Sequence, residues 1–531
     1  MQLTVFHYHF ARGGVTGVVA EAASILLAHN VVEKILLVSG TEENMAELAE
    51  GIARNGEVPR DRVGTAVHPE LRYAADIAGF RVGELVPQIR DLLESRYLAG
   101  DSVWWVHNHH IGKNPAFTQA LIETLRHHPQ QRSILEIHDF PEAGRYENLR
   151  FLGDNISLDP YPLLPRLHYA VINRRDHDIL ATAGIPEASI SLLQNPVRSM
   201  PTPRPAARPP TGLGERLARR YRGVKADGAV LLYPVRCIRR KNVLEAAVLA
   251  RLMEARTGRA MNLLLTLPGL SEQERRYSQM VEDAYSRGVI PGAFGLGAEL
   301  DAVGLSFHEL MQQADLVVST SVQEGFGYAF FEGLASGTPL LARYLDVLRG
   351  SEDLFSSFHT HFYRELQVPF TTPSLSDTRA YLRSRYDEQL DTVREGLPAA
   401  AMEELEEAVE RLLSGESIDF SFLMPQMQYT LLGDLSDRGF LDHVLSMNRE
   451  LAERATALLG NRNAGADAAV QERFGPERFR ESFRTALRQL ETPANEEPAA
   501  GTAGAGSAAV GERVLREFAT LDYLRLLYSG I

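Results

Sequence analysis

Residues 315–342, DLVVSTSVQEGFGYAFFEGLASGTPLLA, hold a strand, a glycine turn, a helix and a second strand in one short stretch. The run DLVVST has the length and the β-branched content of a buried strand. Gly325 and Gly327 then allow backbone conformations that other residues rarely adopt. An apolar helix pattern follows, and PLLA at its end is typical of another strand. This strand–helix–strand order predicts a parallel sheet.

The same alternation occupies two long parts of the chain. Near the start, LTVFHYHF (3–10), KILLVSG (34–40) and SILEIHDF (133–140) are separated by helical patterns. A proline-dense stretch, SMPTPRPAARPPTGLGE (199–215), interrupts the series and has the composition of an extended linker. The alternation restarts at AVLLYPV (229–235). Two α/β domains are therefore expected, as the length of 531 residues also suggests.

The later part of the chain changes character. From about residue 376 the pattern is helical, residues 492–512 are low in complexity, and RVLREFATLDYLRLLY (513–528) is typical of one amphipathic helix. The expected parts are a Rossmann-like domain at 1–198, a proline-rich and basic linker at 199–222, a second Rossmann-like domain at 223–470 with a helical insertion at about 376–460, a crossover helix at 471–491, and a flexible linker with a terminal helix at 492–531.

Composition excludes several classes of protein. A net charge of −14 argues against a nucleic-acid binder and against general attraction to anionic membranes. A single cysteine, Cys237, excludes a disulfide framework and a thiolate metal cluster. No apolar run approaches a membrane span, and MQLTVFHYHFARGG lacks the pattern of a secretory signal, so we expect a cytoplasmic protein. The stretch RLARRYRGVK (216–225) leaves a peripheral membrane contact open beside a solvated linker helix, and a homo-oligomer also stays open.

Ligands of parallel sheets bind beyond the carboxyl ends of the strands. The loop RCIRRKN (236–242) follows such a strand and brings four cations to a helix N-terminus, which suits a diphosphate. A solvated basic loop is the alternative. Glu324 directly precedes the Gly325–Gly327 turn, and Glu332 lies about one and a half turns into the following helix. A helix-dipole glutamate would explain Glu324, but it would not explain the glycine–aromatic spacer.

The stretch EGFGYAFFEGLASGTPLLA resembles the retaining glycosyltransferases of the GT-B fold, especially family 4, in which two glutamates are separated by seven residues. Arg236 and Lys241 match the spacing of the arginine and lysine that bind the donor diphosphate in that family. Residues 170–197 and 469–487 are similar to the family's interdomain approach and to its late crossing helix. Between about 346 and 460 the resemblance is poor, and Asn173 replaces a serine that is usual in the family.

The resemblance implies hexosyl transfer from a UDP- or GDP-sugar to a hydroxyl, with retention of configuration, no cofactor and no required metal. Glu324 would contact hydroxyls of the donor sugar, Glu332 would hold the ribose, and Arg236 with Lys241 would neutralise the leaving diphosphate. The implied catalytic residues are Glu324, His138, Arg236 and Lys241, and the implied donor-binding residues are Gly325, Phe326, Gly327, Glu332 and Gly14.

The loop HNHHIGKNPAF (107–117) is expected to take the acceptor. Lys113 precedes Asn114 and Pro115, which form a good helix start, so an anion can meet both a cation and a helix N-terminus. The histidines lack an assured carboxylate partner for a metal, and DHD (176–178) lies in a helical pattern away from strand ends. We expect a small anionic acceptor, glycerate-like or a sugar phosphate, bound by Arg12, Gly13, His107, His109, Lys113, Asn114 and Arg145.

Three other functions compete with glycosyl transfer. A nicotinamide-dependent oxidoreductase needs G-x-G-x-x-G after a strand, and GGVTG does not supply that spacing. A GT-B sugar-nucleotide epimerase or hydrolase shares the fold and stays open. A non-catalytic nucleotide-sugar binding protein also stays open.

Overall fold

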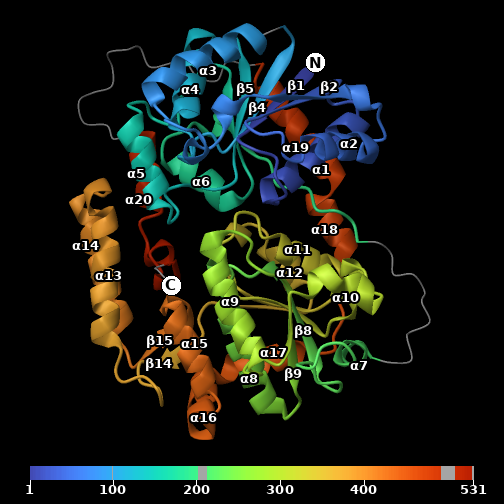
Figure 1. Ribbon diagram of the computed structural model, residues 1–531, viewed down its shortest axis with the longest axis vertical. Helices are drawn as coiled ribbons and strands as arrows, with labels where there is room; N and C mark the ends of the chain where they lie inside the picture. Colours follow the sequence, from blue (N-terminus) through green and yellow to red (C-terminus); the bar gives the residue numbers. More distant parts are fainter. Residues whose placement is uncertain (99, 201–211, 492–508, 529–531) are drawn as a thin grey trace. The chain divides into compact units, whose positions relative to one another are not determined.

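The computed structural model describes residues 1–98, 100–200, 212–491 and 509–528, in which the chain forms two compact units (Figure 1). The first unit comprises Met1–Pro196 and Phe474–Ala519, and the second comprises Val197–Arg473 and Thr520–Ile531. The chain therefore passes from one unit to the other after residues 196, 473 and 519. Each unit is described by itself below.

The first unit contains a seven-stranded sheet in the order β3-β2-β1-β4-β5-β6-β7, and all of its neighbours are parallel. Its strands are β1 (Gln2–His7), β2 (Lys34–Ser39), β3 (Val63–Val67), β4 (Ser102–His107), β5 (Arg132–Ile137), β6 (Leu167–Val171) and β7 (Ile190–Leu192). Its helices are α1 (Gly14–Ala28), α2 (Met45–Asn55), α3 (Val82–Arg96), α4 (Pro115–His127), α5 (Tyr146–Asn155), α6 (Arg174–Thr182), α19 (Pro476–Gln489) and α20 (Val510–Glu517).

Successive residues of the central strand β4 point to opposite faces of this sheet. Trp104 packs edge-on against Phe6 on the face that also receives Phe117 of α4. Trp105 points to the other face, where Phe483 of α19 meets its ring at 5.2 Å between centroids. Figure 1 shows α19, in red, beside α1 in this layer, which the contact between the two helices supports. A late segment of the chain thus completes the core of the first unit.

The second unit has a six-stranded parallel sheet in the order β10-β9-β8-β11-β12-β13. Its strands are β8 (Ala229–Arg236), β9 (Met261–Leu267), β10 (Gly292–Phe294), β11 (Leu316–Ser319), β12 (Leu340–Arg343) and β13 (Thr360–Tyr363). The helices that alternate with them are α7 (Leu213–Ala218), α8 (Val243–Thr257), α9 (Glu272–Ser286), α10 (Phe307–Gln313), α11 (Tyr328–Ala335) and α12 (Glu352–Ser356). The opening stretch of sequence therefore forms β11, α11 and β12, as predicted.

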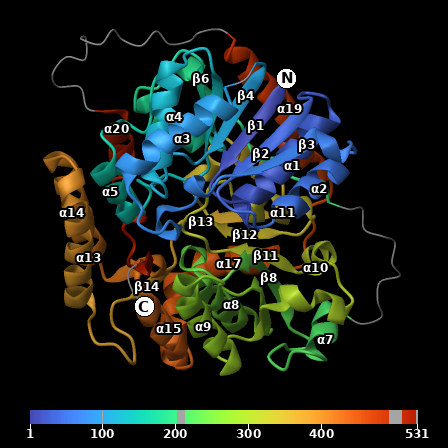
Figure 2. The ribbon, with the colours of Figure 1, turned by 45° about the horizontal axis from the view of Figure 1, so that its top comes forward.

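Additional helices follow the sheet of the second unit. An antiparallel pair, β14 (Gln367–Pro369) and β15 (Ser417–Asp419), encloses α13 (Arg379–Val393) and α14 (Ala399–Ser414) in the sequence. Figures 1 and 2 show α13 and α14 beside each other and away from the six-stranded sheet. The remaining helices are α15 (Pro425–Asp434), α16 (Arg438–Met447), α17 (Arg449–Leu458) and α18 (Ala466–Phe474). Two Rossmann-like parallel sheets with extra helices toward the C-terminus confirm the fold class expected from the GT-B resemblance.

Two segments differ from the expectation. Residues 213–218 of the expected linker form α7, whose Leu213 and Leu217 are buried in the second unit because the helix lies beside β8. The expected terminal helix at 513–528 ends at Glu517 and gives way to two short 3-10 turns. The proline-rich residues 201–211 and the low-complexity residues 492–508 lie outside the described residues. No helix among the described residues combines the length and the apolarity that a membrane span requires.

Candidate functional site

In the second unit, β8 delivers the basic loop to the edge of the sheet. Pro234 has no N–H to donate, and the pairing of β8 with β9 shifts register between Tyr233 and Arg236. Arg236 emerges partly exposed beyond this irregularity, with Nη1 4.0 Å from Oε1 of Glu274. Its guanidinium is thus held loosely and remains accessible.

The next cations lie on a 3-10 turn, Arg239–Lys241, which hydrogen bonds fix to neighbouring strands. The carbonyl oxygen of Lys241 accepts from Oη of Tyr233 at 2.6 Å and from Oγ1 of Thr320 at 3.1 Å. Asn242 then adopts a left-handed conformation, with φ 48°, and starts α8. A non-glycine residue rarely adopts this conformation unless its surroundings stabilise it. The turn is therefore specified by tertiary contacts.

Glu324 is the partner of these cations. Its Oε1 forms an ion pair with Nζ of Lys241, and its Oε2 lies 3.3 Å from Nη1 of Arg240. The Glu324 and Lys241 side chains are only 9% and 11% exposed. Burial alone would raise the pKa of Glu324, but Lys241 and Arg240 outweigh it and lower the pKa. Burial lowers the pKa of Lys241 to about 8. A compact charged cluster thus joins the ends of β8 and β11.

The glycine turn after Glu324 has a steric requirement at one position. Gly327 has φ 89°, and a Cβ there would lie 2.5 Å from Cδ2 of Phe330. Phe326 is 5% exposed and packs against Tyr328 and Phe331, so its ring is part of the core. Packing of the aromatic residues between the two glutamates therefore stabilises the Gly325–Gly327 turn.

Glu332 lies in α11, in partly buried surroundings. Burial raises the pKa of Glu332 to about 7, and the nearby Arg198 opposes this rise. Glu332 therefore titrates near neutrality, whereas Glu324 stays ionised.

In the first unit, the ends of β4 and β5 bring together His107, Glu136 and His138. His107 is the register partner of Glu136, and His138 follows two residues later on the same face. Nδ1 of His107 lies 2.9 Å from Nε2 of His138, which is 3.3 Å from Oε1 of Glu136. Nε1 of Trp105 donates to Oε2 of Glu136 at 2.6 Å. The three side chains are 0, 1 and 5% exposed in that order along the chain.

Burial sets the charge state of this cluster. It raises the pKa of Glu136 to about 8 and lowers the pKa of His138 to about 4. It also lowers the pKa of His107 well below its usual value. A neutral hydrogen-bonded cluster therefore fits this site better than an ion pair. Among the described residues, these three side chains are also the one group whose ligand atoms lie close enough together, within 4.8 Å, to hold a metal ion.

Two other residues of the 107–117 loop have structural roles. Nε2 of His109, which is fully buried, lies 2.8 Å from the carbonyl oxygen of Pro160. Asn114 is also fully buried; it caps α4 by accepting from the Phe117 N–H at 3.0 Å and donates to two backbone carbonyls. The sequence analysis predicted that both residues bind the acceptor, but both side chains are buried and form hydrogen bonds within the fold. The cap at Asn114 is as predicted.

The structure brings Lys113 and Arg145 together around Tyr73. Nζ of Lys113 lies 5.5 Å from the centre of the Tyr73 ring, and the charge of Arg145 adds to burial in lowering the pKa of Lys113. Oη of Tyr73 is 2.9 Å from Nε2 of His9, and Nη2 of Arg145 is 3.2 Å from Oδ1 of Asp139. Two partly exposed cations are thus present in this part of the first unit, with Asp139 paired to Arg145 and the charge of Glu147 acting on Lys113.

The other expected site residues lie elsewhere in the first unit. Arg12 is 81% exposed and pairs with Glu47 of α2 at 2.8 Å. Gly13 and Gly14 form the start of α1, and a Cβ on Gly14 would meet no atom within 4 Å. Asp176, in the DHD triplet, is buried and bonded to Arg175 and Asn173. The triplet is accordingly part of the local packing of α6.

Sequence reasoning missed Tyr73, and it grouped Arg240 with the four cations of the 236–242 loop without naming it among the individual site residues. Tyr73 lies in an irregular segment between β3 and α3, where no local pattern distinguishes it. The adjacency of Arg240 to Lys241 was a signal that it belongs to the site. Only its contact with Glu324, seen in the structure, distinguishes it from an ordinary solvated arginine.

Two parallel-sheet units, each with a buried cluster of titratable side chains at its strand ends, define a two-domain α/β protein. No protein-family model matches the chain. Mannosylglucosyl-3-phosphoglycerate synthase of Petrotoga mobilis is 27% identical over 536 residues, which span 99% of this chain and 99% of that protein. Putative glycosyltransferase EpsD of Bacillus subtilis is 27% identical over 157 residues, 28% of this chain and 37% of that protein. Among solved structures, sucrose-phosphate synthase from Thermosynechococcus elongatus aligns with a TM-score of 0.49 at 12% identity, over 92% of this chain and 99% of that one.

Proposed function

We propose that this protein is a GT-B glycosyltransferase that moves a hexosyl group from a nucleotide diphosphate sugar to a hydroxyl of a small anionic acceptor. The observation that carries the proposal is the cluster of Glu324 with Lys241 and Arg240 at the ends of β8 and β11. Likeness to the Petrotoga mobilis synthase over the whole length supports it. A phosphoglycerate or sugar-phosphate group is the acceptor chemistry that this likeness favours.

In the proposed reaction, the acceptor oxygen bonds to the anomeric carbon as the bond from that carbon to the diphosphate oxygen breaks. The hydroxyl attacks on the same face that the diphosphate leaves, so retention needs no enzymic nucleophile, and the hydroxyl proton passes to the leaving phosphate. Negative charge grows on the diphosphate, and Arg236, Arg240 and Lys241 are positioned to stabilise it. We expect retention of configuration and activity without a metal ion.

Glu324 has two tasks in this proposal. It keeps Lys241 and Arg240 in place before the donor binds, because a buried cation without a counter-charge is unfavourable. Its carboxylate also offers acceptor oxygens to the hydroxyls of the donor sugar. Glu332, which titrates near neutrality, is assigned to the ribose hydroxyls.

The acceptor is assigned to the first unit, at Lys113 and Arg145. An anionic group would gain charge-assisted hydrogen bonds from these two cations, and the Tyr73 hydroxyl adds a hydrogen-bond partner. This assignment is narrower than the set expected from the sequence, because His109 and Asn114 are enclosed.

The test has two stages. Thermal unfolding is measured with UDP-glucose, GDP-mannose and ADP-glucose, because a ligand of the folded state raises its stability by mass action. Products are then analysed by mass spectrometry with 3-phosphoglycerate and glucosyl-3-phosphoglycerate as acceptors, and the anomeric configuration is read by NMR. A free sugar or an epimerised donor would instead identify a hydrolase or an epimerase. Binding without any product would identify a non-catalytic protein.

A further inference from the structure

The last described residues of the chain return to the second unit. After α20, residues Thr520–Tyr528 form two 3-10 turns, Leu521–Tyr523 and Leu526–Tyr528. Leu524, Leu526 and Leu527 are 2% exposed or less. The second turn lies against the Arg239–Lys241 turn and against the 3-10 turn Phe420–Phe422. The last described residues are therefore packed beside the loop that carries the proposed donor cations.

Tyr528 contacts both sequences that build the donor cluster. Its carbonyl oxygen accepts from Nη1 of Arg239 at 2.6 Å, and its hydroxyl donates to Oε1 of Gln323 at 3.1 Å. The carbonyl oxygen of Gln323 in turn accepts from Nη1 of Arg240 at 3.1 Å. Gln323 directly precedes Glu324. One residue near the C-terminus thus ties the basic turn to the glutamate loop.

Arg525 connects the same segment to a buried ionic network. Its guanidinium donates to Oγ of Ser421, lies 3.6 Å from Oδ2 of Asp419, and stacks 4.0 Å from the centre of the Phe422 ring. Arg525 is 7% exposed and Asp419 is 4% exposed. This arginine therefore supplies one of the charges that balance a buried aspartate.

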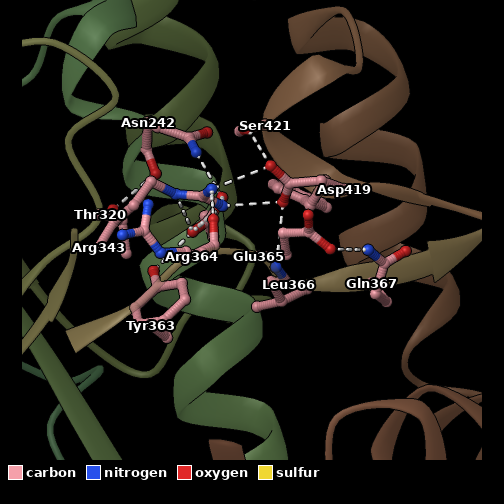
Figure 3. Close-up of polar contacts among 12 residues, drawn as sticks. Asn242, Thr320, Arg343, Tyr363, Arg364, Glu365, Leu366, Gln367, Asp419 and Ser421 are labelled. Atoms are coloured by element: carbon pink, nitrogen blue, oxygen red, sulfur yellow. Dashed lines mark hydrogen bonds and ion pairs between the residues drawn. The ribbon is translucent and has the colours of Figure 1, made fainter. Parts of the chain in front are cut away.

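The network reaches the residue that follows Lys241 (Figure 3). Asp419 accepts from both Nη atoms of Arg343 at 2.9 Å, and Arg343 Nη2 also donates to both carboxylate oxygens of Glu245 at 2.7 Å. Glu245 accepts from Nδ2 of Asn242 at 2.6 Å. Two arginines and two carboxylates balance one another in a buried site, so each depends on the others. This chain of contacts stabilises Asn242 in its left-handed conformation.

We propose that the C-terminal segment Thr520–Tyr528 positions the diphosphate-binding turn, with Tyr528 as the positioning residue that locks Arg239 to Gln323. The inference rests on the proposed function, because it assigns the segment to the same donor site. Tyr528 acts through its neighbours: it keeps Lys241, Arg240 and Glu324 in the geometry that receives the donor. Its loss weakens donor binding and leaves acceptor binding unchanged.

The experiment uses the full chain and three variants, Tyr528→Phe, Tyr528→Ala and a chain that ends after Arg525. Tyr528→Phe keeps the ring and the carbonyl that accepts from Arg239 and removes only the bond to Gln323. Thr520→Ala is the matched control, because Thr520 is exposed and belongs to the same segment. The dissociation constants of UDP-glucose, GDP-mannose and ADP-glucose are measured by calorimetry, together with the KM of donor and acceptor.

We expect Tyr528→Phe to weaken binding of the accepted donor by about threefold, the loss of one hydrogen bond. The shortened chain, which also loses the acceptor of the Arg239 bond, should weaken it by about tenfold. Donor KM rises and acceptor KM does not, which a general loss of structure would not produce. If the shortened chain fails to fold, the donor affinities of Tyr528→Phe and Tyr528→Ala, compared with that of the unmodified chain, test the positioning role of Tyr528.

Equal donor affinity in all folded variants would overturn this inference while the proposed function stands. If the unmodified chain binds none of the three nucleotide sugars, the proposed function fails, and the inference fails with it. A parallel rise of donor and acceptor KM would mean that the segment only stabilises the fold, and this too would overturn the positioning role.

Discussion

The two strand-end clusters differ in charge although both are buried. In the second unit, Glu324 lies against Lys241 and Arg240, and opposite charges keep both sides ionised. In the first unit, Glu136 lies against His138 and an indole N–H, and burial without a permanent cation favours the protonated carboxyl. A buried glutamate therefore stays charged only where the fold supplies an arginine or lysine. The charged cluster suits a diphosphate, and the neutral one suits the positioning of polar groups.

The largest expected effect is on the charged cluster. Glu324→Gln removes the counter-charge of two cations and the carboxylate proposed for the donor sugar. We expect kcat/KM to fall by about 10²–10³, as for the loss of one preorganised electrostatic group. Steady-state kinetics with saturating acceptor measure it, and circular dichroism confirms that the variant is folded. A fall of less than threefold would show that this cluster is not the reacting site.

Glu136→Gln tests the neutral cluster through pH. The pKa of Glu136 rises from 4.5 to about 8 on folding, so the folded state keeps a proton that the unfolded state releases, and this carboxyl destabilises the protein increasingly as pH rises from about 4.5 to about 8. The amide does not titrate, so its stability relative to the natural chain should grow by about 2 kcal/mol between pH 6 and pH 8. Urea unfolding at both pH values measures the difference.

The control for Glu136→Gln is Glu332→Gln measured in the same way. Glu332 is only partly buried and its pKa is about 7, so its contribution should level off above neutral pH. A difference for Glu136→Gln that does not change with pH would mean that Glu136 is ionised, and the contrast between the two clusters would disappear.

Lys113→Ala extends the comparison to the proposed acceptor site. We expect the acceptor KM to rise by about tenfold, the effect of losing one ionic contact to an anion, and the donor KM to stay constant. Arg81→Ala, at an exposed arginine of the same unit, is the control for a general change in surface charge. An unchanged acceptor KM in Lys113→Ala would remove Lys113 from the site.

The smallest expected effect concerns Glu332 and the donor. Its pKa of about 7 means that the carboxylate becomes protonated as pH falls below neutrality and accepts fewer hydrogen bonds. Donor KM should therefore rise by about threefold between pH 8 and pH 6 in the natural chain. Glu332→Gln should show a raised donor KM that no longer increases toward pH 6, and the remaining pH dependence should come from Lys241, whose pKa is about 8. Donor titrations at the two pH values distinguish these outcomes.

Local pattern predicted much of the proposed donor site. The strand before Glu324, the glycine turn and the helix that carries Glu332 follow from apolar runs, breakers and length, and these signals lie within a few residues of each other. The order of parallel strands then places RCIRRKN and QEGFG at neighbouring strand ends, because β8 and β11 are adjacent. The sequence placed Glu324 and Lys241 in one site, but their direct ion pair was not predicted, since it joins residues that are distant in the sequence.

The acceptor side was less predictable. The sequence presents His107, His109 and Asn114 as polar loop residues, and nothing local indicates that all three side chains are fully buried. Tyr73 enters from a different irregular segment and meets Lys113 only in the folded unit. The proposed role of the C-terminal residues was equally hidden, because RVLREFATLDYLRLLY has a continuous helical pattern, whereas the helix ends at Glu517 and Leu526 and Leu527 are buried in a 3-10 turn.

The sequence by itself determined the parallel sheets, the strand-end loops and the types of side chain that these loops carry. Those features depend on periodicity and on residues close together in the chain. Only the tertiary structure decided which polar groups are paired, which are enclosed and which titrate near neutral pH. Burial and charge partners set these properties, and both depend on contacts between residues such as Gln323 and Tyr528 that the sequence separates widely.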